Sequence, residues 1–463
     1  MSIKAYLFVL GYLLYKVVAL VHPIEIYDKF FIDSITRQPF YIRGVDYQPG
    51  GASGITKEKD PLSDPNICAR DILLFQDLGI NTVRVYSINP DLNHDICMSI
   101  LASAGIYLVL DVNSPLPGQH LNRYQPWTTY NNDYLEHVFK VIKQFSGYNN
   151  TLGFFAGNEV VNDKRSAKNS PTFIKQLIND MKLFMKLYCP RTIPVGYSAA
   201  DDLKYRISLS KYLACADYNL PEGSVDFYGV NTYQWCGDQT FHSSGYDILV
   251  EDYEEYSKPV FFSEFGCNKV TPRNFQEVEA IFSPAMCTVF TGGLVYEFSQ
   301  ETNKYGLVEI DTNNDVHLLS DFKALKERYT ATLLPSALDI IQILKMKNSK
   351  SGENTKVHGR GINKRDQMGE MCEKQYENLE ITKETPPDLA AEVIESGIDV
   401  EKGEFVLLKE KDLQTTHKIY DIESTLPYKS SNGNKIQILV DIFGISDEEL
   451  QQLSTVSNEA RMY

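Results

Sequence analysis

The sequence predicts an α/β fold, a (β/α)8 or TIM barrel with a short, partly irregular C-terminal extension. Between residues 24 and 330, eight short runs rich in β-branched and aromatic residues alternate with segments of helical character. Eight such alternations within roughly 300 residues are typical of this barrel. An open, doubly wound sheet is the structural alternative, and no glycine-rich dinucleotide fingerprint supports it.

The predicted strands are short apolar runs, and polar side chains follow most of them. They span residues 40–45, 82–86, 107–111, 153–156, 193–197, 227–231, 259–263 and 293–296. Stretches with apolar residues three or four apart predict helices over residues 68–78, 134–145 and 172–187. Because catalytic groups of such barrels lie at the carboxyl ends of the strands, these polar residues are the first candidates for a site.

Composition excludes some functions. The chain has 463 residues, enough for one large domain and a smaller part. Its formal net charge of -16 argues against a surface for nucleic acid or anionic membranes, so no nucleic-acid partner is expected.

The N-terminus has the pattern of a secretory signal peptide, predicted over residues 1–19. Lys4 supplies the positive charge, residues 5–14 form the apolar segment, and residues 17–19 form a cleavage motif. A membrane-spanning helix is the rival interpretation, but the uninterrupted run is shorter than the ~20 residues that spanning needs. We expect a secreted mature chain with no transmembrane segment.

The eight cysteines of a secreted chain are expected to be mostly oxidised. No CxxC motif or Cys/His cluster has zinc spacing, so we expect no metal site and no cofactor. A sequon, Asn149-Asn150-Thr151, stands just before the fourth predicted strand and makes Asn149 a candidate for glycosylation.

Two glutamates stand where buried strands are predicted to end. Glu159 follows the fourth strand directly after Asn158, and Glu264 follows the seventh. In the barrel these two strand ends face each other across the mouth. The alternative for each glutamate alone is a solvated strand terminus.

A pair of carboxyl groups about 5 to 5.5 Å apart performs glycoside hydrolysis with retention of configuration. One protonates the leaving oxygen and the other attacks the anomeric carbon. Glu159 is the predicted acid/base and Glu264 the predicted nucleophile, while the amide of Asn158 is suited to a sugar 2-hydroxyl. Tyr233 and Tyr296, also at strand ends, are candidates to orient Glu264, although ordinary packing explains a single tyrosine equally well.

Six strings carry a family resemblance, and together they are highly specific. They resemble the fungal β-1,3-glucanosyltransferases of glycoside hydrolase family 72, in the subgroup without a C-terminal cysteine-rich carbohydrate-binding module. The resemblance covers residues 24–330. The strings are RGVDYQPGG (43–51), NTVRVY (81–86), FFAGNEV (154–160), PVGYSAAD (194–201), FSEFGC (262–267) and GGLVYE (292–297).

The resemblance implies a secreted enzyme that cleaves β-1,3-glucan internally and transfers the new donor segment to the non-reducing end of another chain, remodelling the fungal cell wall. Glucan chains are then its donor and acceptor partners. Glu159 resembles the family's acid/base and Glu264 its nucleophile. The positions resembling the donor groove are Gln48, Tyr86, Asp111, Asn158, Tyr233 and Tyr296, those resembling the acceptor side are Asp201 and Arg206, and Asn122 and Tyr305 match less well.

The resemblance also implies a cysteine pairing, which leaves Cys189 and Cys287 as thiols. The implied disulfides are Cys68 with Cys97, Cys236 with Cys267, and Cys215 with Cys372. The chain departs from many members because its last residues show no hydrophobic tail for a glycolipid anchor. We expect a secreted protein at the cell surface or wall that is freely secreted, is held in the wall by other means than this anchor, or has an atypical C-terminus.

The C-terminal extension, residues 331–463, is expected to be tied back through Cys372 and partly disordered. A loop or linker is predicted over residues 345–366, a strand over 435–440 and a short helix over 446–453.

Two other functions fit the same residues. A β-1,3-glucan hydrolase would use the same glutamates, with water in place of the acceptor sugar. A wall-binding protein that has lost turnover would keep the groove, but the intact glutamate pair argues against it.

Overall fold

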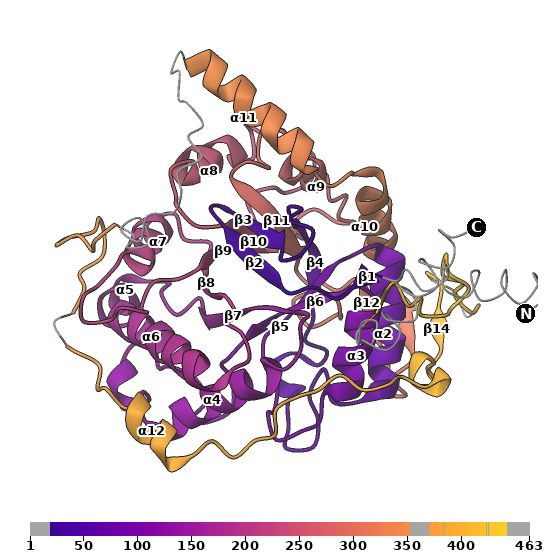
Figure 1. Ribbon diagram of the computed structural model, residues 1–463. Coiled ribbons are helices and arrows are strands. Elements are labelled where there is room, and N and C mark those ends of the chain that lie inside the picture. The colour runs from indigo at the N-terminus through magenta and orange to yellow at the C-terminus, as the bar shows by residue number, and fades with distance from the viewer. Residues whose placement is uncertain (1–18, 352–369, 383, 423, 425, 442–463) are drawn as a thin grey trace, which may run out of the picture.

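The computed structural model describes residues 19–351, 370–382, 384–422, 424 and 426–441. Its centre is a closed barrel of eight parallel strands in the order β10-β11-β4-β5-β6-β7-β8-β9, which confirms the predicted fold class. Figure 1 shows these strands at the centre of a ring of helices. They are β4 (Ile42–Asp46), β5 (Thr82–Val85), β6 (Tyr107–Asp111), β7 (Thr151–Asn158), β8 (Val195–Ala199), β9 (Phe227–Asn231), β10 (Val260–Phe265) and β11 (Phe290–Val295).

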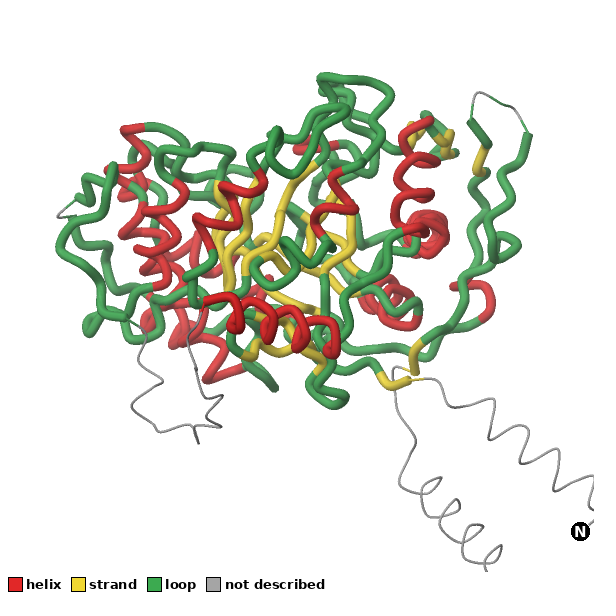
Figure 2. Tube along the Cα trace, turned by 90° about the horizontal axis from the view of Figure 1, so that it is seen from above, coloured by secondary structure: helices red, strands yellow, loops and turns green. Residues whose placement is uncertain are grey.

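Helices follow the strands and cover the outside of the barrel, with the strands enclosed between them in Figure 2. In the first of these helices, α2 (Pro65–Leu78), local sequence determines where the helix begins and ends. The Asp64 side chain accepts hydrogen bonds from the backbone of Asn66 and Ile67, and Gly79 ends the helix with φ 72°. The helices are α2 (Pro65–Leu78), α3 (Asp95–Ser103), α4 (Asn132–Phe145), α5 (Lys164–Asn169), α6 (Pro171–Tyr188), α7 (Arg206–Ala214), α8 (Tyr246–Tyr253), α9 (Glu277–Ile281) and α10 (Ser320–Ala331), and 3-10 turns span Gly51–Ser53 and Pro126–Thr128.

A hairpin of β2 (Ile24–Tyr27) and β3 (Phe30–Asp33) closes the end of the barrel where the strands begin. Its Phe31 is fully buried and meets Phe227 and Phe261 edge-on, with ring centroids 5.7 and 6.0 Å apart. Gly153 and Gly196 make room for the Phe227 ring, since a Cβ there would lie 2.7 and 2.2 Å from its atoms. The lower barrel is therefore filled by aromatic side chains.

Beyond the barrel, the chain forms a small sheet and then a long helix. The strands β12 (Val308–Ile310), β13 (Val316–Leu318) and β14 (Ile419–Tyr420) make this three-stranded sheet. The helix α11 (Ala337–Ser351) projects from the body in Figure 1. The prediction of a loop from residue 345 is wrong as far as Ser351. A box of hydrogen bonds between Ser336 and Asp339 starts this helix, and it propagates through lysines that favour helix.

The described residues from 370 to 441, which we call the C-terminal strap, run around the outside of the barrel (Figure 1). Strap backbone groups bond to α5 at Lys168, to α4 at Gln144 and to α3 at Ser103. Its elements are α12 (Ala390–Ser396), a 3-10 turn at Glu410–Leu413, β14, and β15 (Val440–Asp441), which pairs with β1 (Ala19–Leu20).

Only the last residue of the strand predicted at 435–440 lies in a strand. Gln437 instead exchanges two hydrogen bonds with the side chain of Gln76 on α2, and Leu439 N donates to Ser103 O. The backbone of this run therefore bonds to helices α2 and α3. The predicted signal peptide, apart from its last residue, the 446–453 helix and the chain end lie outside the described residues.

Three disulfides connect distant parts of the chain in the pairing that the resemblance implies. Cys68–Cys97 joins α2 to α3, Cys236–Cys267 joins the loops after β9 and β10, and Cys215–Cys372 joins the end of α7 to the strap. Cys189 and Cys287 are outside these disulfides. Among the described residues, no helix combines the length and apolar character needed to cross a membrane.

Candidate active site

A cleft of about 690 Å³ opens at the end of the barrel where the strands finish. Glu159 and Glu264 line it together, so the structure brings the two predicted glutamates to one site from β7 and β10. The other predicted residues that line this cleft are Gln48, Tyr86, Asp111, Asn158 and Tyr296.

Glu159 stands directly after β7 in a backbone conformation that side chains seldom adopt. Its φ is 49°, and its backbone N–H donates to Ser198 O at 2.9 Å. A left-handed non-glycine residue stores strain, and such strain is common at functional sites. The turn ends the strand and leaves the partly exposed Glu159 at the cleft.

Asn231, the last residue of β9, orients the Glu159 carboxyl. Its side-chain amide donates to Glu159 Oε1 at 2.8 Å and to Asn158 Oδ1 at 3.3 Å. The amide itself is held, because its oxygen accepts from Ser263 Oγ at 2.8 Å and Ser198 Oγ at 3.1 Å. The buried side chains of Asn231, Ser198 and Ser263 thus hold the partly exposed Asn158 and Glu159 in position.

Glu264 receives three donors. Tyr86 OH and Arg84 Nη1 lie 2.9 and 3.3 Å from Oε1, and Tyr233 OH lies 2.8 Å from Oε2. The residue is only 7% exposed. Its rotamer is therefore fixed before any ligand enters.

Opposing effects act on the ionisation of Glu264. Burial and, to a smaller extent, the nearby Glu159 raise its pKa, whereas Arg84, Tyr233 and Tyr86 lower it, and the balance of these effects puts the pKa at about 7. The three donors favour the carboxylate, the form that a nucleophile needs. Removing any of them should raise this pKa.

Arg84 is the cation at the centre of the site. Its side chain is fully buried and stacks between the rings of Tyr86 and Phe155, at 4.3 and 4.6 Å from their centroids. It pairs with Asp111 at 3.0 Å as well as with Glu264. Burial raises the pKa of Asp111 to about 6, against the lowering effect of Arg84.

Two further carboxyl groups, those of Asp46 and Glu297, lie near Glu264. Asp46 at the end of β4 is completely buried, and neither of its carboxyl oxygens has a hydrogen-bond partner among the described residues. Burial, together with Glu264, Glu297 and Asp111, raises its pKa well above the usual range, against Arg84. Burial also raises the pKa of Glu297 to about 7, although Asn303 donates to it at 2.9 Å.

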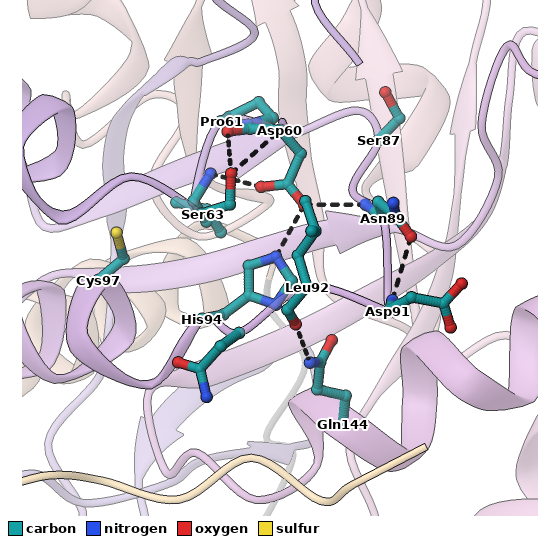
Figure 3. Close-up of polar contacts among 12 residues, drawn as sticks. Asp60, Pro61, Ser63, Ser87, Asn89, Asp91, Leu92, His94, Cys97 and Gln144 are labelled. Atoms are coloured by element: carbon teal, nitrogen blue, oxygen red, sulfur yellow. Dashed lines mark hydrogen bonds and ion pairs between the residues drawn. The ribbon is translucent and has the colours of Figure 1, made fainter. Parts of the chain in front are cut away.

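Gln48 fixes the loop after β5. Its side-chain oxygen accepts from the backbone N–H groups of Tyr86 and Ser87, both at 3.1 Å, and its amide donates to Ser87. Figure 3 shows the support of the same loop farther along. There Asp60 accepts from Asn89 N at 2.9 Å and pairs with His94 at 2.8 Å.

Tyrosine rings form a wall beside the glutamates. Tyr233 lies edge-on to Tyr296 and Tyr305, with centroids 6.3 and 5.6 Å away, and Tyr296 also meets Tyr86 at 6.4 Å. Tyr233 and Tyr305 are outside the lining of the main cleft. Such rings combine an apolar face with a hydroxyl, which suits a sugar.

Asp201 and Arg206 form an ion pair with atoms 3.2 Å apart, in and just after the loop that follows β8. Neither lines the main cleft, but Asp201 Oδ2 accepts from Tyr233 N at 3.2 Å. The pair therefore contacts the backbone of Tyr233, whose hydroxyl donates to Glu264. Asn122, a weaker expectation, starts a turn at residues 122–125.

Asn149 lies far from these groups, just before β7 begins, where its side chain is partly buried and 3.5 Å from Val21 O.

No cluster of three or more His, Cys, Asp or Glu side chains suited to a metal ion occurs in the part of the chain that the structure describes.

Three site residues, Asp46, Arg84 and Asn231, had no role predicted from the sequence. Asn231 and Asp46 stand at strand ends, the criterion that selected Glu159, so the same signal was available for them. Arg84 lies inside a strand, where the usual prediction for a charged side chain is that it faces solvent. Its burial among carboxyl groups depends on barrel closure.

Comparison with known proteins identifies relatives across most of the chain. Residues 14–333 match the glucanosyltransferase family. The 1,3-beta-glucanosyltransferase GAS4 of Saccharomyces cerevisiae is 59% identical over 403 residues, which are 87% of this chain and 81% of the relative. The 1,3-beta-glucanosyltransferase gel2 of Aspergillus fumigatus is 51% identical over 66% of this chain and 64% of its own.

A solved structure is similar as well. Saccharomyces cerevisiae Gas2p in complex with laminaripentaose has a TM-score of 0.63 and 41% identity, covering 68% of this chain and 70% of that chain. Both strand-end glutamates lie within residues 14–333, the range that matches the family.

Proposed function

The chain belongs to the 1,3-beta-glucanosyltransferases of glycoside hydrolase family 72, and from that premise we propose that Glu159 and Glu264 carry a retaining transfer of β-1,3-glucan segments. The observation that supports these roles is the environment of each glutamate. Glu264 accepts three hydrogen bonds that favour its carboxylate, whereas Glu159 accepts one from a neutral amide. The first suits a nucleophile and the second a group that gives and takes a proton.

In the first step, Glu264 attacks the anomeric carbon of a glucosyl unit in the donor chain. Glu159 gives its proton to the glycosidic oxygen, so the leaving chain departs with a free 3-hydroxyl. The product is a glucosyl ester on Glu264. As its negative charge is lost, Tyr86, Tyr233 and Arg84 hold the remaining ester and the new charge on Glu159 is stabilised by Asn231.

In the second step, the ionised Glu159 removes a proton from the 3-hydroxyl at the non-reducing end of an acceptor chain. That oxygen attacks the anomeric carbon and the ester bond to Glu264 breaks, which regenerates both glutamates. Two inversions give a β-1,3 linkage again. Asn158 offers its amide to the sugar 2-hydroxyl beside this carbon.

We place this reaction outside the cell, at the wall glucan. Two observations support this location: the family acts on glucan, and the three disulfides of this chain persist in an oxidising compartment. Residues lining the cleft with Glu159 are assigned to the donor chain, and Asp201 with Arg206 to the acceptor.

The test is a product profile from a reducing-end-labelled laminari-oligosaccharide, with Glu264→Gln as control. Products longer than the substrate that vanish in the control support transfer. Only shorter products would mean that water resolves the ester and the enzyme is a hydrolase. If the wild-type protein leaves the oligosaccharide unchanged, it binds glucan without turning it over.

Azide separates the roles of the two glutamates. With an activated aryl β-laminari-oligosaccharide, Glu159→Ala still forms the ester, and azide resolves it to a β-glycosyl azide. Glu264→Ala has no nucleophile, so azide attacks directly and gives the α-glycosyl azide. The opposite products would reverse the assignment.

A further inference from the structure

A second hollow of about 580 Å³ lies where the C-terminal strap meets the barrel loops. The barrel contributes Lys164, at the start of α5, with Lys204 and Tyr205, from the loop before α7. The strap contributes the whole opposite wall, from Lys374 to Ile381. The hollow thus exists only because the strap is docked.

This hollow faces the same end of the barrel as the glutamates. Lys164 and Lys204 belong to the segments that follow β7 and β8, and loops after strands gather at the carboxyl end. The first segment carries Glu159 and the second carries Asp201. Tyr205 is the direct neighbour of Arg206.

The chemistry of the reaction places the hollow on the acceptor side. The acid/base protonates the oxygen of the leaving chain and later activates the acceptor, so both chains leave the centre past Glu159. If Asp201 and Arg206 hold the acceptor, a longer acceptor would pass along the loop before α7, which carries Lys204 and Tyr205 of the hollow.

The strap wall is held rigidly. Cys372 is bonded to Cys215, and Cys372 N donates to Ala216 O at 3.0 Å. Farther on, Asn378 donates to Lys204 O at 3.1 Å, and Thr382 N to Lys168 O at 3.0 Å. A wall pinned on both sides of the hollow loses little entropy when a ligand binds.

The side chains suit a neutral polyol. The exposed lysine, glutamine and asparagine side chains from 374 to 378 offer donors for hydroxyl groups. Glu380 lies 3.8 Å from Lys164 and 3.9 Å from Lys168, so it offsets part of their charge and adds an acceptor.

We propose that strap residues 374–381 form a distal acceptor subsite for the β-1,3-glucan chain, so that the strap sets the preference for long acceptors. The proposal rests on the proposed transferase function. It assigns to the strap a part in substrate selection, in addition to its packing on the barrel.

The test uses the full chain with Lys374→Ala and Gln375→Ala combined, both exposed positions. The matched control combines Lys411→Ala and Gln414→Ala, the same residue types on a part of the strap packed against α2 and α3. Transfer rates are measured with a fixed donor and laminari-oligosaccharide acceptors of increasing length, and the unfolding midpoint of each variant is recorded.

We expect the first variant to raise KM for long acceptors by about threefold to tenfold, the loss of one or two hydrogen bonds, with short acceptors and kcat unchanged. The control should match the wild type throughout. Equal effects at all lengths, or none at any length, would overturn the subsite while wild-type elongation stands. A wild-type chain that only shortens glucan contradicts the proposed function itself, and the subsite with it.

Discussion

The two ends of the barrel interior differ in kind. Where the strands begin, Phe31, Phe155, Phe227 and Phe261 pack ring against ring with no charge among them. Where the strands finish, several carboxyl groups surround Arg84. The lower end stabilises the barrel, and the upper end holds charge that burial makes costly. The stack of Arg84 on Phe155 is the boundary between them.

The difference between the two ends indicates that the aromatic side chains support the active site indirectly. It holds the strands in register, so charged side chains that repel one another remain buried at fixed positions. Substitutions at the boundary should affect both stability and activity, and those on either side only one.

Arg84→Met is expected to have the largest effect. The variant keeps an apolar stem against Phe155 but leaves Glu264 and Asp111 without their cation. Activity should fall at least about a hundredfold, and the free energy of unfolding by about 3–5 kcal/mol. Steady-state kinetics and denaturant unfolding measure both, with the exposed Arg37→Met as control. If the variant lost only activity or only stability, Arg84 would not lie at the boundary between the two ends.

Phe227→Ala should affect stability alone. Its ring contacts Phe31, Phe155 and Phe261, so its removal leaves a cavity that costs about 3–5 kcal/mol of unfolding free energy. Below the unfolding transition, kcat per folded molecule should equal that of the wild type. Phe227→Leu, which fills part of the space, should lose less. A large fall in kcat at low temperature would show that the two ends are coupled.

Tyr233→Phe should change the pH dependence. Without this donor, the pKa of Glu264 rises above about 7, because burial then acts on a less stabilised carboxylate. Glu264 must be ionised to attack, so the acid limb of kcat/KM should move to higher pH, by about one unit. Tyr305→Phe is the control, since its hydroxyl bonds the backbone of Asn268. A limb that stays in place would exclude Glu264 as the titrating group.

Asp46→Asn should have the smallest effect. Burial without partners and the nearby carboxyl groups raise the pKa of Asp46 well above its usual range, which favours the protonated acid, and an amide is the closest replacement for that form. Activity should stay within about threefold of the wild type. Asp111→Asn, which removes a partner of Arg84, should lose more. Equal losses would mean that Asp46 is ionised.

Local sequence predicted the strands and glutamates because these depend on short patterns. An apolar run that stops at Asn158-Glu159 is visible in the chain, and barrel topology then places it opposite Glu264. The role of Arg84 was not predictable, since its neighbours come from β6 and β10. Nor was the path of the strap, whose Gln437 bonds a helix side chain although its own run has the pattern of a strand.

The strap also bears on how the molecule assembles. Its docking points, at Ala216, Lys168, Gln144, Ser99 and Gln76, belong to five separate stretches of the barrel. The strap is synthesised after all of them. It therefore finds its full set of partners only on a completed barrel, and resistance of residues 370–441 to a protease would report that the helices beneath have assembled in their correct order.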